Sequence, residues 1–483
     1  MVIDALKYQI LQQFGFVPTE EQGQALDAFA RFLTDRDPHA VMILRGSAGT
    51  GKTSLSGAIV RTLKAIRQKV MLLAPTGRAA KVFSLNSGCP AYTIHRRIYR
   101  EKSFAGVDGQ FNLNDNLFTD TLFMVDEASM ISNLGLGGGN FGSGCLLEDL
   151  VRFVYQGHND RLMLIGDKAQ LPPVGEEESP ALNRMMLEGY GLKVYECDLN
   201  EVLRQSQESG ILYNATVIRQ MITHDDITQL PLIRFKGFAD IVMMPGNELV
   251  ESLANSYYRV GQDETMVITR SNKRANIYNN GIRNMVLDRE DELSCGDMLM
   301  IVKNNYFWTE KERNEVKEAL NAIPPFLANG DRTKVLRVSR HMELYGFRFA
   351  TLLLQFPDYD NYEMSVTALL DTLQSEAPAL THEQQEQLFH GVEEDYQDVP
   401  LKADRMKAIR GDQYFNALQV KYAYAITCHK AQGGQWEHVY VDQGYMTDDM
   451  LTPDYIHWLY TAFTRAKDKL FLVNWPKTQT EQA

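Results

Sequence analysis

The chain has 483 residues, of which 44% are hydrophobic and 23% are charged, and its formal net charge is −13. This length predicts two or more domains with sizeable cores, and the composition is that of an ordinary globular protein. No apolar run approaches the roughly 18 residues of a membrane span, and the first turns, with Asp4 and Lys7, lack a signal-peptide core, so we expect no membrane association.

The five cysteines stand far apart, without the paired spacing of a zinc or iron–sulfur site. We expect free thiols in a reducing cytoplasm at Cys89, Cys145, Cys197, Cys295 and Cys428. The negative charge is concentrated in positions 350–400, which hold eleven acidic residues and no Lys or Arg, against 49 basic and 51 acidic residues elsewhere. Because salt screens that distant segment, the net charge does not exclude a nucleic-acid partner.

Residues 1–38 have a helical pattern, and Thr19 with Gln22 three residues later marks a capped helix start. The apolar run 40–44 then leads into the glycine-rich loop Gly46–Thr53 and a helix-like segment up to Lys64. A strand, a glycine loop, a lysine, a hydroxyl and a helix in this order predict a site for a nucleoside triphosphate. The assigned residues are Gly46, Ala48, Gly49, Thr50, Gly51, Lys52, Thr53 and Ser54.

The glycines let backbone N–H groups turn toward phosphate oxygens, and the following helix offers its unpaired N-terminal N–H groups to the same anion. Lys52 can reach the β- and γ-phosphates, and the Thr53 hydroxyl can ligate Mg²⁺. The alternative, a glycine loop with a surface lysine, does not account for the flanking strand and helix. The sequence therefore predicts ATP and Mg²⁺ as cofactors.

Three more buried-strand patterns follow, at 69–74, 122–125 and 161–165, and each ends in polar residues. Continuous apolar runs separated by helical stretches indicate a parallel sheet, whose ligands bind at the carboxyl ends of the strands. Asp126 is placed to hold the metal and Glu127 to polarise the attacking water, while Gln170 can sense the γ-phosphate. A second parallel sheet is predicted from the runs 265–269, 422–426, 438–441 and 469–473.

Seven stretches of this chain resemble, in order and spacing, the motifs of superfamily 1 helicases, and they match best the 5′-to-3′ (1B) branch of RecD-like, Dda-like and Pif1-like enzymes. They are Gly46–Thr53, Pro75–Lys81, Asp126–Ser129, Gly166–Val174, Leu199–Arg204, Thr427–Gly433 and Tyr460–Lys467. The resemblance covers nearly the whole chain, with 326–412 the least constrained part. It implies two RecA-like domains with ATP between them and single-stranded DNA across their top.

The resemblance also implies roles for individual residues. Arg204 and Arg465 would approach the γ-phosphate from the second domain, Gln22 would contact adenine, and Gly433 would lie near the nucleotide. A surface ion pair is the alternative for each arginine, and helix capping alone is the alternative for Gln22. Contacts to DNA are implied for Pro75, Thr76, Arg78, Thr93, His95, Thr427, His429 and Lys430. Basic residues interleaved with aromatics over 78–104 fit sequence-independent strand binding, although a solvated basic helix face would look similar.

Three segments look like insertions. Residues 96–120 resemble a β-hairpin that acts as a pin at the duplex, with Phe104 or Phe111 stacking on a base. The glycine-rich stretch 133–144 departs from the family pattern, and we interpret it as a passive insertion rather than a closing loop.

From 326 the pattern is strand-rich and resembles an SH3-like barrel. We expect helices over 357–400, facing away from DNA, where a partner protein could dock, although a solvated surface is the simpler interpretation. The segment 305–325 suggests no role.

The predicted fold is α/β, with two RecA-like parallel-sheet P-loop domains, an inserted hairpin and an inserted SH3-like barrel. The predicted bounds are 1–95 with 121–200 for domain 1A, 96–120 for hairpin 1B, 201–325 with 413–483 for domain 2A, and 326–412 for subdomain 2B.

The predicted function is an ATP-dependent DNA helicase, acting as a monomer, that moves 5′ to 3′ on single strands and unwinds DNA at single-strand/duplex junctions. The alternatives are a strand-stimulated ATPase that remodels nucleoprotein complexes and a small-molecule kinase, which would explain neither the second sheet nor Arg465.

Overall fold

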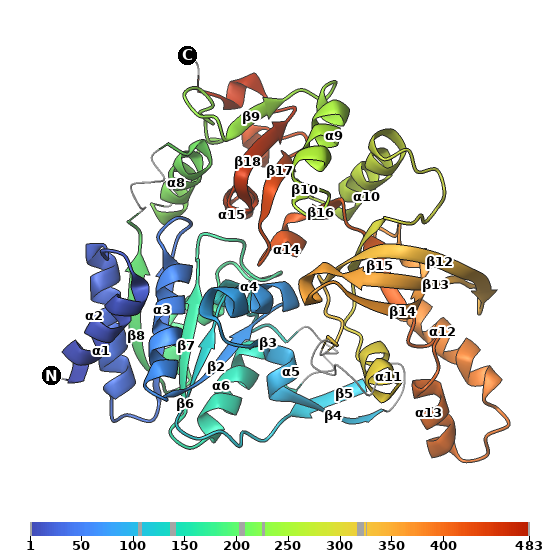
Figure 1. Ribbon diagram of the computed structural model, residues 1–483, viewed down its shortest axis with the longest axis horizontal. Coiled ribbons are helices and arrows are strands. Elements are labelled where there is room, and N and C mark those ends of the chain that lie inside the picture. The colour runs from blue at the N-terminus through green and yellow to red at the C-terminus, as the bar shows by residue number, and fades with distance from the viewer. Residues whose placement is uncertain are drawn as a thin grey trace.

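The structure is a computed structural model that describes residues 2–104, 109–135, 142–201, 208–224, 228–315, 323–324 and 326–481. For residues 2, 101–104 and 109–111 it describes the backbone alone. In Figure 1 the N-terminal domain occupies the lower left, a second domain lies above it, and a β-barrel lies to the right. None of the helices in the described ranges has the length and apolar character needed to cross a membrane.

The first domain is a six-stranded parallel sheet in the order β3-β2-β6-β7-β1-β8. The strands are β1 (Ala40–Gly46), β2 (Lys69–Ala74), β3 (Ala91–Thr93), β6 (Thr121–Val125), β7 (Arg161–Gly166) and β8 (Lys193–Leu199). The helices are α1 (Val2–Phe14), α2 (Glu20–Thr34), α3 (Lys52–Ala65), α4 (Gly77–Ser87), α5 (Ile94–Ile98), α6 (Leu146–Gln156) and α7 (Arg184–Gly189).

Alternating residues of β1 enter two different cores, because successive side chains of a strand point to opposite faces. Met42 and Leu44 pack in the core beneath α1, α2 and α3, whereas Val41 and Ile43 pack in the core beneath α5 and α6. The sheet is thus covered on both faces, as its continuous apolar runs predicted. The polar residues that follow β1, β2, β6 and β7 all lie at the carboxyl edge of this sheet.

The second domain is a five-stranded parallel sheet in the order β16-β10-β17-β18-β9. Its strands are β9 (Ile241–Met244), β10 (Thr265–Thr269), β16 (Ala425–Thr427), β17 (Trp436–Asp442) and β18 (Ala466–Val473). The helices are α8 (Gly210–Thr223), α9 (Leu249–Arg259), α10 (Asn272–Gly281), which continues into a π-helix (Ile282–Val286), α14 (Cys428–Ala431) and α15 (Pro453–Phe463).

A closed five-stranded barrel is inserted in the second domain. It consists of β11 (Met298–Ile301), β12 (Arg332–Leu344), β13 (Phe347–Phe356), β14 (Tyr362–Leu369) and β15 (Leu418–Tyr422), with α11 (Phe307–Glu315), α12 (His382–Asp395) and α13 (Lys402–Arg410) attached. The predicted bounds 326–412 are too narrow, because β11 precedes them and β15 follows them. The apolar run 422–426 is not one strand: Tyr422 ends β15 in the barrel, and Ala425 begins β16 in the sheet.

Two other insertions are only partly as predicted. A two-stranded hairpin, β4 (Tyr99–Phe104) and β5 (Gly109–Leu113), lies within 96–120 and pairs Glu101 with Phe111. The acidic stretch 357–400 is not wholly helical, because β14 of the barrel lies inside it before α12 begins. The middle of the glycine-rich stretch, 136–141, is outside the described residues.

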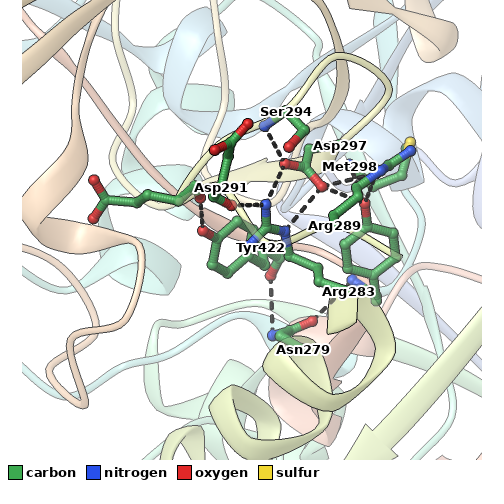
Figure 2. Close-up of polar contacts among 10 residues, drawn as sticks. Asn279, Arg283, Arg289, Asp291, Ser294, Asp297, Met298 and Tyr422 are labelled. Carbon is green, nitrogen blue, oxygen red and sulfur yellow. Dashed lines mark hydrogen bonds and ion pairs between the residues drawn. The ribbon is translucent and has the colours of Figure 1, made fainter. Parts of the chain in front are cut away.

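The barrel is tied to the second domain by a buried polar network around Asp297, whose side chain is fully buried (Figure 2). Its carboxylate accepts hydrogen bonds from Arg283 Nε at 3.0 Å and from Arg289 Nη1 at 2.8 Å. The backbone N–H of Ser294 donates to the same carboxylate at 2.7 Å. Arg283 lies in the π-helix and Asp297 immediately precedes β11, so the network fixes the base of the barrel on the sheet that carries the second half of the site.

Candidate nucleotide site and strand interface

A cleft of about 640 Å³ runs between the two parallel sheets and is lined by the loop after β1 together with residues of the second domain. Gly49 and Gly51 have positive φ angles of 79° and 76°, the left-handed region that glycine adopts without strain. A Cβ on Gly46 would lie 3.0 Å from Thr50 Oγ1. Helix α3 starts at Lys52 without a side-chain cap, so its first N–H groups are available to an anion.

Lys52 and Thr53 line this cleft, as the motif predicted. Lys52 Nζ donates to the carbonyl oxygen of Gly46 at 2.6 Å, so the lysine is folded over its own loop. Thr53 is exposed to the cleft and its hydroxyl is available as a metal ligand. Ser54, the next residue of α3, is also exposed.

Asp126 and Glu127 follow β6 and line the same cleft. Burial raises the pKa of Asp126, the charge of Glu127 raises it further, and Lys52 acts in the opposite direction. The Glu127 N–H donates to Asp126 Oδ1 at 2.9 Å, and Glu127 has a φ of 51°, a conformation that non-glycine residues seldom adopt. Two adjacent carboxylates beside a lysine are a suitable place for a divalent cation and an activated water.

Gln170 lies in the loop after β7, is 6% exposed, and lines the cleft. Its Oε1 is buried and accepts no hydrogen bond from the described residues. A buried polar atom without a partner is costly unless a ligand or water satisfies it. This atom, the glycine loop and the carboxylate pair together fit a nucleoside triphosphate with Mg²⁺.

The second domain supplies Arg465 and Gly433 to the cleft. Arg465 is 3% exposed and bonds to the carbonyl oxygens of Thr461 and Gly434 at 3.0 and 3.2 Å. No carboxylate of the described residues lies within ion-pair distance of it, which fits a guanidinium reserved for an anionic ligand. The alternative of a surface ion pair is therefore wrong for Arg465. Arg204 is outside the described residues.

Gln22 caps α2 as its spacing predicted. Its Oε1 accepts from the Thr19 N–H at 3.0 Å, and its Nε2 donates to the Thr50 carbonyl at 2.9 Å. The side chain is 1% exposed. Both polar atoms of the Gln22 amide are thus hydrogen-bonded within the protein, and the bond to the Thr50 carbonyl supports the glycine loop directly. Contact with adenine stays a prediction and would require this arrangement to change.

The residues after β2 lie at the domain interface. Thr76 caps α4 by accepting from the Ala79 N–H at 3.2 Å, and Pro75 precedes it, half-buried. Arg78 turns toward the second domain, where Nη2 donates to the Gln435 carbonyl at 3.0 Å and the guanidinium lies over the Trp436 ring. Arg78 also lines the nucleotide cleft. Its assignment to DNA alone therefore missed an interdomain contact.

Thr93 lines a second cavity, of about 500 Å³, between α4 and α5 of the first domain and the barrel, and His95 is not in the lining. Thr93 caps α5, and burial lowers the pKa of His95 to about 4, so this histidine is neutral near pH 7. Two arginines line the cavity from opposite sides, Arg96 and Arg313. Phe104 and Phe111 lie in β4 and β5, but the structure does not describe their side chains.

Thr427, His429 and Lys430 occupy the turn from β16 into α14. His429 is exposed, and Thr427 caps the helix without a side-chain hydrogen bond. Lys430 Nζ is buried and has no hydrogen-bond partner among the described residues, and burial together with the charge of Lys421 lowers its pKa to about 8. Their common position at a strand end matches the predicted strand contacts, which stay predictions.

Sequence reasoning missed two second-domain side chains that contact the phosphate loop. The Ala48 N–H donates to the Tyr460 hydroxyl at 2.9 Å, and Arg219 Nη1 donates to Ser47 Oγ at 2.7 Å. Tyr460 begins the stretch Tyr460–Lys467 that also contains Arg465, so its place in a matched motif was the available signal. Arg219, in α8, stands in no such stretch.

Two family models match the chain. Residues 19–228 match the AAA domain family and residues 422–473 match the UvrD-like helicase C-terminal domain family. Among curated proteins, an uncharacterised protein of Methanocaldococcus jannaschii is 34% identical over 171 residues, which covers 33% of this chain and 14% of that protein. The ATP-dependent RecD2 DNA helicase of Deinococcus radiodurans is 32% identical over 157 residues, covering 32% of this chain and 18% of that helicase.

The chain therefore spans less than a fifth of the length of these two relatives. An uncharacterised protein of Acanthamoeba polyphaga mimivirus is 22% identical over 494 residues and covers 90% of this chain and 96% of that protein. Solved structures that are similar include the Pif1 helicase from Bacteroides with ADP-AlF3 and single-stranded DNA (14% identity, TM-score 0.46, 97% and 95% coverage). The Pif1 helicase from Candida albicans matches at 16% identity and a TM-score of 0.41, with 97% coverage of each chain.

The two family matches fall on the two parallel sheets, in the order in which the motifs run along the chain. The match to the RecD2 helicase agrees with the branch that the motifs resemble. Over residues 19–228 and 422–473 the chain is thus similar to the AAA domain family and to the UvrD-like helicase C-terminal domain family.

Proposed function

We propose that this protein is an ATP-dependent DNA helicase that translocates 5′ to 3′ on single-stranded DNA as a monomer. One observation carries the proposal: a single cleft brings Lys52, Glu127 and Gln170 of the first domain opposite Arg465 of the second. The relatives that bear the name helicase, and the Pif1 structures with single-stranded DNA, concern those proteins, and their activity is proposed for this chain.

The residues of the cleft suit hydrolysis of ATP. When bound, ATP with Mg²⁺ supplies the phosphoryl group and its charge-neutralising cation. Thr53 and Asp126 would hold the metal, and Lys52 would leave the Gly46 carbonyl for the phosphates. Glu127 would take the proton of the attacking water, Gln170 would contact the γ-phosphate, and Arg465 would offset its charge, with Arg204 proposed for the same task.

Motion would come from this cleft closing on ATP and reopening after hydrolysis, with the grip on the strand alternating between the domains. The proposed strand contacts are the residues after β2 and β16 and the pin hairpin. A protein partner for the acidic segment 357–400 and a cytoplasmic location remain predictions.

The test is strand separation on a duplex with one single-stranded tail, comparing a 5′ tail with a 3′ tail, with ATP and Mg²⁺. We expect unwinding from the 5′ tail alone, loss of unwinding in Lys52→Ala, and wild-type unwinding in Lys64→Ala, an exposed lysine at the far end of the same helix. Unwinding only from the 3′ tail would refute the direction. Strand-stimulated hydrolysis without unwinding from either tail would favour the remodelling ATPase.

A further inference from the structure

The hydroxyl group of Tyr460 joins the two domains at the nucleotide loop. It accepts a hydrogen bond from the Ala48 N–H at 2.9 Å and donates to Asp167 Oδ2 at 2.7 Å. Ala48 and Asp167 both belong to the first domain, and Tyr460, which is 1% exposed, belongs to α15 of the second. Arg465, just beyond this helix, makes its hydrogen bonds within the second domain. Tyr460 is therefore the more direct link between the two domains.

The neighbours of Tyr460 on α15 hold the loop that carries Gln170. Thr461 Oγ1 accepts from the Leu171 N–H at 2.8 Å, and His457 Nδ1 lies 2.9 Å from the Ala169 carbonyl oxygen. Positions 457, 460 and 461 are spaced to share one face of a helix. This face therefore contacts the first domain immediately before and after the residue placed to sense the γ-phosphate.

The same helix contacts the proposed strand-binding turn. Cys428 Sγ, in α14, donates to the Trp458 carbonyl of α15 at 3.6 Å. Helix α14 also carries His429 and Lys430. Because a packed helix moves as a unit, a displacement of α15 imposed at the phosphate loop is passed on to α14.

We propose that Tyr460 is a positioning residue that couples nucleotide occupancy of the phosphate loop to the affinity of the second domain for single-stranded DNA. This inference rests on the proposed function and adds to it the residue that transmits the nucleotide state. The hydroxyl satisfies a backbone donor of the loop and a carboxylate at the end of β7 simultaneously. Without it the loop can rearrange around phosphates while α15 stays in place.

The test uses Tyr460→Phe, which removes the hydroxyl and keeps the ring in its packing. The dissociation constant of a fluorescent oligonucleotide is measured without nucleotide and with a non-hydrolysable ATP analogue, and the ratio of the two constants is the coupling factor. We expect this factor to move toward one by about three- to tenfold, the net worth of a hydrogen bond. The dissociation constant of the oligonucleotide measured without nucleotide should change by less than about twofold. By reciprocity, the effect of DNA on analogue binding should fall by the same factor.

Tyr440→Phe is the matched control. The Tyr440 hydroxyl is hydrogen-bonded to the hydroxyls of Ser252 and Ser256, each at 2.7 Å, and all three residues lie in the second domain. This variant loses two hydrogen bonds of a fully buried tyrosine without touching the cleft, so its coupling factor should equal that of the wild type. Thr461→Val, which removes the acceptor for Leu171, should lower the factor as well and serves as the second test should Tyr460→Phe not fold.

A wild-type coupling factor in Tyr460→Phe, or in Thr461→Val where that variant replaces it, would overturn the inference. An equal loss in Tyr440→Phe would overturn it too, because general loosening of the second domain would then suffice. If the wild-type protein neither hydrolyses ATP nor binds the strand, the proposed function itself fails.

Discussion

The guanidinium of Arg78 lies over the ring of Trp436, 4.4 Å from its centroid, although the two residues belong to different domains. The backbone of Gln435 accepts a hydrogen bond from the same guanidinium. A residue of the predicted strand-binding stretch thus helps to hold the two sheets together across the nucleotide cleft. If Arg78 contacts the strand as predicted, strand binding and cleft geometry would be connected at this side chain.

Arg78→Ala should increase the population in which the domains separate. The variant loses a cation–π contact, worth about 0.5–2 kcal/mol, and one hydrogen bond, so that population should rise about tenfold. Energy transfer between dyes on the two domains, without nucleotide, measures it. Arg61→Ala is the control, because the Arg61 guanidinium donates to the carbonyl oxygens of Asn86 and Gln13, which both lie in the first domain. Equal transfer in both variants would contradict the prediction.

Gly433→Ala should slow ATP hydrolysis by an amount that its loss of folding stability does not explain. Gly433 has a φ of 72°, and a Cβ there would lie 3.1 Å from Ala79 Cβ and 3.2 Å from Thr76 Oγ1, both across the cleft. Gly444→Ala is the control, with a φ of 70° and open space around the new methyl group. Both variants should lose about 1 kcal/mol of folding stability to backbone strain. Only Gly433→Ala should also reduce the kcat of strand-stimulated ATP hydrolysis. We expect a reduction of roughly tenfold, which corresponds to the loss of one hydrogen bond.

Asp297→Asn should cost far more stability than removal of an exposed carboxylate. The change leaves Arg283 and Arg289 buried beside a neutral side chain, and breaking a buried ion pair costs about 3–5 kcal/mol. Glu292→Ala removes the partly exposed partner of Arg348 and should cost less than about 1 kcal/mol. Urea unfolding of both variants, followed by circular dichroism, gives the comparison. Similar midpoints would show that the network does not hold the barrel in place.

Asp331 should make the folded state less stable as pH rises. Burial raises the pKa of Asp331 from 3.8 to about 7, so between these values the folded chain keeps a proton that the unfolded chain has lost. The contribution is complete below pH 4 and disappears as pH rises through 7, and it is on the order of 4 kcal/mol. Asp331→Asn keeps an acceptor oxygen for the Ala328 N–H and the Tyr359 hydroxyl. The melting temperature should therefore change less between pH 5 and pH 8 in this variant than in the wild type. An equal change in both proteins would contradict the raised pKa of Asp331.

The sequence predicted central strands better than edge strands. β1, β6 and β7 are buried on both faces and appear as continuous apolar runs, whereas β8, at the edge of the first sheet, is mostly half-exposed and was not found. The edge strands β3 and β9 were missed because they are partly exposed as well and have only three and four residues. The barrel bounds were wrong because its closure joins β11 to β15, which lie far apart along the chain and leave no local signal.

For the site, the motifs gave the identity of the cleft residues but not the direction of their side chains. The glycine loop, Asp126, Glu127, Gln170 and Arg465 meet in one cleft as expected. The spacing of Thr19 and Gln22 gave the cap, yet nothing local shows that Gln22 also bonds to the Thr50 carbonyl. The turn of Arg78 and Tyr460 toward the opposite domain likewise depends on how the two sheets pack, which spacing does not encode.

The route of the chain through its sheets implies an order of folding during synthesis. Every strand of the first sheet lies between Ala40 and Leu199, so this domain can form as soon as that part has left the ribosome. The second sheet cannot close early, because β9, near residue 241, pairs with β18, which ends at Val473. The barrel must likewise wait for β15. The nascent chain will thus carry the phosphate loop for more than 200 residues before Arg465 is added. On the proposed function, the growing polypeptide would be able to hold a nucleotide before it could hydrolyse one.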